Sequence, residues 1–151
     1  MRLEEMNTEK PVSTKWHSNT NDTAIIDTNY IVLRFNTESV YFNHWYKAKL
    51  NSIKPVNISK NEIIEIDKIA QAYIYQNKIN LLDWSAYKRQ YIPVINDKGE
   101  KEVWVNCLCQ TIDSDWKKRA IIVMDGGNCF FNFTISLTTK NITDFSINGL
   151  G

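Results

Sequence analysis

The stretch from Val123 to Ile135 constrains the fold most strongly, because it places a tight turn between two apolar segments. The turn runs from Asp125 to Asn128 and contains two glycines, which accept the positive φ angles of a twisted hairpin. After the turn, apolar and polar residues alternate, which is typical of an antiparallel strand with one buried face. The face that we predict to be buried contains Cys129, Phe131, Phe133, Ile135 and Leu137.

A single long helix is predicted from Ser59 onward. Ser59 and Glu62 have the spacing of a capping box, in which each side chain accepts a hydrogen bond from a backbone amide of the first turn. Apolar residues then recur at steps of three and four, and the pattern ends near Gln76. These apolar residues are Ile63, Ile66, Ala70, Tyr73 and Ile74.

Strands are predicted on both sides of this helix. Before it, residues 24–26 and 30–35 are β-branched and aromatic, whereas the apolar spacing over 40–50 favours a short helix. After it, the strands are predicted at 87–95, 102–110, 119–124, 129–138 and 144–148, with hairpin turns at 96–100 and 125–128.

This order of elements predicts an α+β fold. One long helix packs on a curved antiparallel sheet of four to six strands, as in cystatin-like and NTF2-like domains. Residues 1–23 are polar and are predicted to form a flexible N-terminal arm. Residues 24–151 are predicted to form a single α+β domain.

The charge balance and the hydropathy pattern limit the possible partners. Eighteen Lys and Arg residues face 17 Asp and Glu residues, so we expect no nucleic-acid binding, which usually requires a strongly basic domain. No apolar run is long enough for membrane insertion or for a signal peptide. We therefore expect a cytoplasmic protein, or a periplasmic or secreted one if a leader has been removed.

The three cysteines are Cys107, Cys109 and Cys129. An odd number argues against a complete disulfide framework. Cys107 and Cys109 are two positions apart, so they share one face of their strand. We expect three reduced and buried thiols, since free cysteine is among the most buried residue types. A disulfide between Cys129 and one of the other two is the alternative.

No group of residues has a spacing that indicates chemistry. His17 and His44 each lie beside a tryptophan and lack the partners of a catalytic triad. Asp113 and Asp115 are typical of a solvated turn, and the cysteine spacing does not match a zinc site. We predict no catalytic residue, metal site or cofactor, and an enzyme is the less favoured class.

Three strings carry a resemblance to known proteins. Residues 87–91 (YKRQY), 103–109 (VWVNCLC) and 125–132 (DGGNCFFN) are similar to strings in small, functionally uncharacterised bacterial proteins. The likeness covers roughly the last two-thirds of the chain on the strength of element order. It implies the α+β fold and a bacterial source, and it implies no activity.

Two classes of function stay open. The first is a non-catalytic protein-binding module, such as an immunity or inhibitor protein or a secretion-associated adaptor. The aromatic content of 12% favours this class, because aromatic and arginine side chains carry much of the binding energy at interfaces. The second is an NTF2-like small-ligand binder or enzyme with a pocket between helix and sheet. It requires polar side chains that point inward, whereas the inward face we predict is apolar.

A candidate interaction surface follows from the strand phases. Trp104 is out of phase with Val103 and Val105, so we expect it to be exposed on the face opposite the core. The preceding strand lies alongside and carries aromatic and arginine side chains at alternate positions. The predicted surface consists of Trp104, Trp116, Tyr87, Arg89 and Tyr91.

Overall fold

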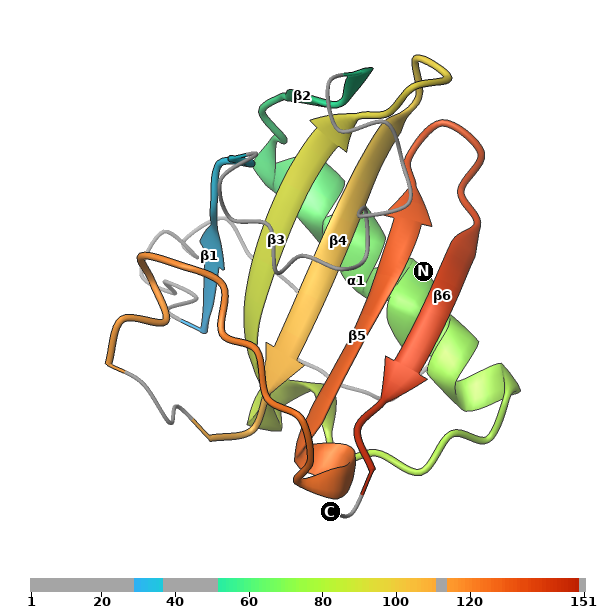
Figure 1. Ribbon diagram of the computed structural model, residues 1–151. Coiled ribbons are helices and arrows are strands. Elements are labelled where there is room, and N and C mark those ends of the chain that lie inside the picture. The colour runs from blue at the N-terminus through green and yellow to red at the C-terminus, as the bar shows by residue number, and fades with distance from the viewer. Residues whose placement is uncertain (1–28, 37–51, 111–113, 150–151) are drawn as a thin grey trace, which may run out of the picture.

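The computed structural model describes residues 29–36, 52–110 and 114–149. Within these ranges the chain forms one α-helix and a six-stranded sheet, which confirms the α+β class (Figure 1). The predicted arm at 1–23, the strand at 24–26, the helix at 40–50 and the residues His17, His44 and Asp113 lie outside the described residues.

The helix α1 spans Lys60–Gln76 and lies on one face of the sheet. The strands are β1 (Tyr30–Val32), β2 (Lys54–Pro55), β3 (Lys88–Ile95), β4 (Lys101–Leu108), β5 (Phe130–Ser136) and β6 (Ile142–Ile147). Two short 3-10 turns, η5 (Trp84–Ala86) and η6 (Gly127–Cys129), precede β3 and β5. The strand order is β1-β3-β4-β5-β6, and β2 pairs with the end of β3.

The sheet is mixed rather than wholly antiparallel. Strands β3 to β6 are antiparallel neighbours in chain order, and the predicted hairpin of β3 and β4 is confirmed. In contrast, β1 lies parallel to β3, with Tyr30 opposite Arg89. The connection between these two strands contains α1, and a crossover that contains a helix is the usual way to join parallel strands.

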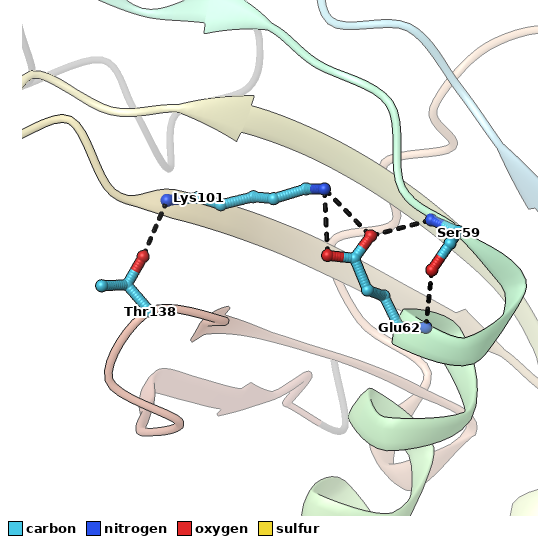
Figure 2. A network of polar contacts seen from close by, with 4 residues as sticks. All are labelled: Ser59, Glu62, Lys101 and Thr138. Carbon is cyan, nitrogen blue, oxygen red and sulfur yellow. Dashed lines mark hydrogen bonds and ion pairs between the residues drawn. The ribbon is translucent and has the colours of Figure 1, made fainter.

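The N-terminus of α1 is capped and tied to the sheet (Figure 2). The predicted capping box is confirmed, because Glu62 N donates to Ser59 Oγ (3.1 Å) and Ser59 N donates to Glu62 Oε1 (2.8 Å). Lys101 Nζ on β4 donates to both oxygens of Glu62, at 2.9 and 3.0 Å. Burial alone would raise the pKa of Glu62, but these hydrogen bonds outweigh it and hold the pKa below its usual range.

The apolar face of α1 packs on alternate residues of the central strands. Phe131, Phe133 and Ile135 on β5 are fully buried in one cluster with Ile66 and Ala70 of the helix. The predicted core face of this strand is therefore confirmed, except at Cys129, which packs beside the apolar cluster on the opposite face. Each such side chain contributes about 1.5–3 kcal/mol when it is fully removed from water.

The opposite face of the sheet is also buried, which the alternation did not predict. Residues 116–123, which we call the covering segment, run across this face, in orange in front of the sheet in Figure 1. Apolar residues of the covering segment pack on Trp104, Leu108 and Phe130, the side chains of β4 and β5 that point away from the helix. The packed residues are Trp116, Ala120 and Ile121.

Two buried amide side chains bind the backbone of the covering segment. Gln90 Nε2 donates to the carbonyl oxygens of Trp116 (2.6 Å) and Arg119 (2.8 Å), and Gln90 Oε1 accepts from Ile121 N (3.1 Å). Asn106 Nδ2, opposite Gln90 in the ladder, donates to Ile121 O (2.7 Å). The segment therefore satisfies its buried backbone groups without joining a ladder.

The predicted strand at 119–124, and hence the predicted hairpin with β5, is wrong. Both edges of β5 are already paired, one with β4 and the other with β6, so no edge is open to this segment. Gly126 and Gly127 do have positive φ angles, 97° and 61°, but they lead into η6. A side chain at Gly126 would meet the ring of Phe130 at 2.5 Å.

The expectation of three free thiols is wrong, because Cys109 and Cys129 form a disulfide. The backbone pairing of β4 and β5 continues one step beyond the strands, where Cys109 N donates to Cys129 O (2.8 Å). Cys107 lies opposite Phe131 instead, and it stays a buried free thiol. The bond links residues 20 positions apart, a loop for which chain entropy predicts about 3 kcal/mol of stabilisation.

Thiol titration checks this pairing. Native protein should show no rapidly reacting thiol, because Cys107 is fully buried. Denatured protein should show one thiol without a reductant, and three after reduction, since Cys107, Cys109 and Cys129 are the three cysteines of the sequence. Three reactive thiols in unreduced denatured protein would contradict the disulfide.

Candidate functional site

The five side chains of the predicted interaction surface are all buried, so their predicted exposure is wrong. Tyr87, Arg89 and Tyr91 occupy the helix side of β3 and the residue before it. Trp104 does lie on the face opposite the helix, as its phase predicts, but it is buried in an apolar cluster with Leu33, Phe35 and Ala120. Trp116 packs on the same face, with the ammonium groups of Lys88 and Lys117 about 5.5 and 5.4 Å from its ring centre.

The helix side of β3 contains a polar cluster within the core. Arg89 Nε donates to the hydroxyl of Tyr91 (2.9 Å), and this hydroxyl donates to Asp67 Oδ1 of α1 (2.5 Å). Arg89 also donates from Nη1 to Tyr87 O (3.0 Å). The cluster therefore joins a cation, a hydroxyl and a carboxylate between helix and sheet. The predicted wholly apolar inward face is wrong at these positions.

Burial controls the ionisation of two groups in this region. Burial raises the pKa of Tyr91 well above its usual value, and the adjacent Asp67 raises it further against the opposing effect of Arg89. Burial likewise raises the pKa of the Cys107 thiol. At neutral pH both groups are therefore uncharged, and the cysteine is a poor nucleophile.

The sequence pattern did not identify Asp67 as a buried residue, because the buried face of the helix was predicted from its apolar residues alone. The residue lies four positions after Ile63 and three before Ala70, which places it on the buried face. A carboxylate on the apolar stripe of an amphipathic helix is a signal for a buried polar partner. Tyr91 and Arg89 on β3 provide hydrogen-bonding partners for this region.

The end of α1 opens a groove beside this cluster. The helix stops in a Schellman motif, in which Ile79 N donates to Ile74 O (3.0 Å) and Lys78 N to Tyr75 O (3.2 Å). Lys78 adopts the left-handed conformation, with φ 52°, that usually favours glycine. The chain then turns back across the end of the sheet in an extended segment, residues 79–83, and enters η5.

The groove between α1 and this returning segment has a volume of about 550 Å³. This volume lies within the usual range for small-molecule sites, about 300–1,000 Å³. The sheet provides its floor through Phe131. Its apolar walls are formed by Ile74, Tyr75, Ile79, Leu81, Leu82 and Trp84. The polar lining residues are Gln71, Lys78, Asn80 and Asp83.

Two side chains of the groove are unusually exposed for their type. Tyr75 is 84% exposed and Leu82 is 46% exposed, and both are among the groove's lining residues. Large apolar side chains exposed next to a concave surface are typical of an interaction site. These two residues replace the predicted surface as the candidate contact residues.

The hydroxyl of Tyr87 holds the outer wall of the groove in place. It accepts a hydrogen bond from Leu82 N (3.0 Å) and donates one to Asn128 O in η6 (2.6 Å). Asn128 Nδ2 also donates to Asn80 O (3.4 Å). The returning segment is therefore fixed against η6, the turn that the disulfide ties to the end of β4.

Trp84 connects the groove to the polar cluster. The guanidinium of Arg89 lies 5.3 Å from the centre of its ring, within the range of a cation–π contact. Its indole Nε1 is buried and has no hydrogen-bond acceptor among the described residues. An unsatisfied buried donor costs about 1–3 kcal/mol, and such groups are rare in native proteins.

Comparison of the chain with protein-family models, curated proteins and solved structures finds no match. No helix within residues 29–36, 52–110 and 114–149 has the length and apolar character needed to cross a membrane. In the same part of the chain, no group of three or more His, Cys, Asp or Glu residues could hold a metal ion.

The polar cluster should contribute much more to stability than the partly exposed ion pair at the start of the helix. Arg89→Met removes a buried cation from a cluster that keeps the Asp67 carboxylate, and we expect a loss of about 3–5 kcal/mol in the free energy of unfolding. Lys101→Met, the matched control, breaks the partly exposed contact with Glu62 and should cost about 0–1 kcal/mol. Equal losses in urea denaturation would contradict the assigned role of Arg89.

Proposed function

We propose that the protein is a non-catalytic protein-binding module that holds an apolar side chain of a partner in the groove at the end of α1. One observation carries this proposal: the groove's lining includes Tyr75 and Leu82, two large apolar side chains that the fold leaves exposed. Exposed aromatic and aliphatic side chains around a concave site are typical of an interface hot spot.

A protein segment fits this groove better than a fully enclosed small molecule. Tyr75 extends from the last turn of α1, and Leu82 lies on the returning segment, so a bound segment can contact both walls at once. Gln71, Asn80 and Asp83 provide amide and carboxylate groups for the backbone of such a segment.

Immunity or inhibitor proteins and secretion-associated adaptors are the classes that we propose within this function. The arrangement of one helix on a curved sheet supports a cystatin-like or NTF2-like assignment of the fold. The Cys109–Cys129 disulfide supports an oxidising compartment, such as the periplasm or the exterior of a bacterial cell, because disulfides persist there.

The second class, a small-ligand binder or enzyme with an internal pocket, gains one supporting observation. Asp67, Arg89 and Tyr91 are titratable or charged side chains that point between helix and sheet, as such a pocket requires. They are nevertheless joined by hydrogen bonds through the Tyr91 hydroxyl, and they do not line the groove. We therefore place this class second.

Partner binding by two surface variants tests the proposal. Tyr75→Ala combined with Leu82→Ala removes the two exposed contacts, and we expect at least about a tenfold loss of affinity for the partner captured from the source organism. Ile122→Ala combined with Met124→Ala is the matched control. It removes two side chains that are also exposed, 44% and 85%, but that do not line this groove.

Both variants should keep the unfolding midpoint of the original protein, because exposed side chains contribute little to stability. The proposal fails if the groove variant binds the partner undiminished or if the control variant loses it. Binding of a small apolar molecule in the groove, with no protein partner captured, would favour the second class.

A further inference from the structure

We propose that the Cys109–Cys129 disulfide is a redox switch for the groove, so that reduction loosens its outer wall and weakens partner binding. This inference rests on the proposed function of the groove. It concerns the path of contacts from the disulfide to Leu82, one of the two exposed contact residues.

The path is short and each step is a direct contact. Cys129 ends η6 and is covalently bound to Cys109 at the end of β4, with 4.9 Å between their Cα atoms. Its neighbour Asn128 accepts a hydrogen bond from the Tyr87 hydroxyl (2.6 Å), which in turn accepts from Leu82 N (3.0 Å). Two hydrogen bonds through the Tyr87 hydroxyl therefore connect η6 to the groove wall.

A second contact follows the same route. Asn128 Nδ2 donates to Asn80 O (3.4 Å), so the backbone of the returning segment contacts η6 directly at Asn80 and through the Tyr87 hydroxyl at Leu82. The disulfide also closes the loop that contains the covering segment, residues 116–123. Breaking the bond therefore removes the covalent link at η6 and leaves the backbone hydrogen bond from Cys109 N to Cys129 O (2.8 Å), at a point where the chain on the N-terminal side of η6 is not part of the sheet ladder.

The two residues of the disulfide lie nearer the surface than the remaining thiol. Cys109 and Cys129 are both partly exposed, while Cys107 is fully buried. A dithiol reductant, such as a thiol–disulfide oxidoreductase, supplies the two electrons. One thiolate of the reductant attacks a sulfur of the disulfide, which gives a mixed disulfide and releases one protein thiol. The second thiol of the reductant then attacks the reductant's own sulfur in the mixed disulfide and releases the other protein thiol. The products are two protein thiols and the oxidised reductant, with two electrons and two protons transferred to the protein.

Amide hydrogen exchange tests the switch without any partner. The Leu82 amide donates directly to Tyr87, so its exchange rate reports on this contact. We expect reduction by a dithiol to accelerate Leu82 exchange by about tenfold through local opening of this contact, with the Gly99 amide in the turn between β3 and β4, which donates to Asn96 O, unchanged as a control for local opening elsewhere. The Cys109→Ala, Cys129→Ala protein should show the same fast exchange without a reductant.

A tyrosine variant is the matched control for the path. Tyr87→Phe removes the hydroxyl while keeping the ring, so Leu82 exchange should already be fast in the oxidised protein and reduction should add nothing. The proposal is overturned if reduction leaves Leu82 exchange unchanged in the original protein. It is also overturned if Leu82 and Gly99 accelerate together, since reduction would then loosen surface turns in general rather than the groove.

Partner affinity separates failure of the switch from failure of the proposed function. With the captured partner, we expect reduced protein to bind at least about fivefold more weakly than oxidised protein, a usual size for coupling between sites. Equal affinity in both states overturns the switch and keeps the proposed function. If neither state binds a partner, the proposed function fails, and with it the inference that the loosened wall controls binding.

Discussion

The pairing of β3, β4 and β5 places apolar side chains on both faces of one sheet, and the rest of the molecule depends on covering these two faces. The helix covers one face through Ile66 and Ala70. The described part of the chain contains no second α-helix, and the covering segment lies on the other face instead. The groove forms where α1 stops and only the extended segment at 79–83 continues over Tyr87 and Phe131.

Buried polar groups determine how these layers fit together. Gln90 and Asn106 face each other across β3 and β4 and bind the backbone of the covering segment. Asp67 and Tyr91 link the helix to β3 on the other side. Apolar packing alone tolerates small shifts between layers, whereas hydrogen bonds of this kind are satisfied in one arrangement. We infer that the two sets of polar contacts position α1 and the covering segment on the sheet.

The residues whose structure follows from local rules were predictable. Ser59 and Glu62 gave the start of the helix, and the alternation of Phe131, Phe133 and Ile135 gave the core face of β5. Trp104 was given the correct face for the same reason. Its burial was not predictable, because the residues that pack on it lie far away in the sequence. They are Leu33, Phe35, Ile53 and, in the covering segment, Ala120.

The candidate site depended on contacts that the sequence pattern does not contain. Tyr87, Arg89 and Tyr91 were correctly placed on one face, but the direction of that face depends on the register with β4. The disulfide depends on the pairing continuing past Leu108, which brings Cys109 rather than Cys107 opposite Cys129. The groove arises from the Schellman turn at Lys78, and a lysine in a left-handed conformation gives no glycine signal in the sequence.

Nuclear magnetic resonance mapping of the surface of this protein that contacts the partner tests the central claim most directly. When isotope-labelled protein is titrated with the captured partner, the largest amide shift changes should fall on Tyr75, Ile79 and Leu82 around the groove. The exposed positions Ile122 and Met124, which do not line this groove, should stay unchanged. Changes centred on those two residues, with residues 74–84 unaffected, would contradict the account.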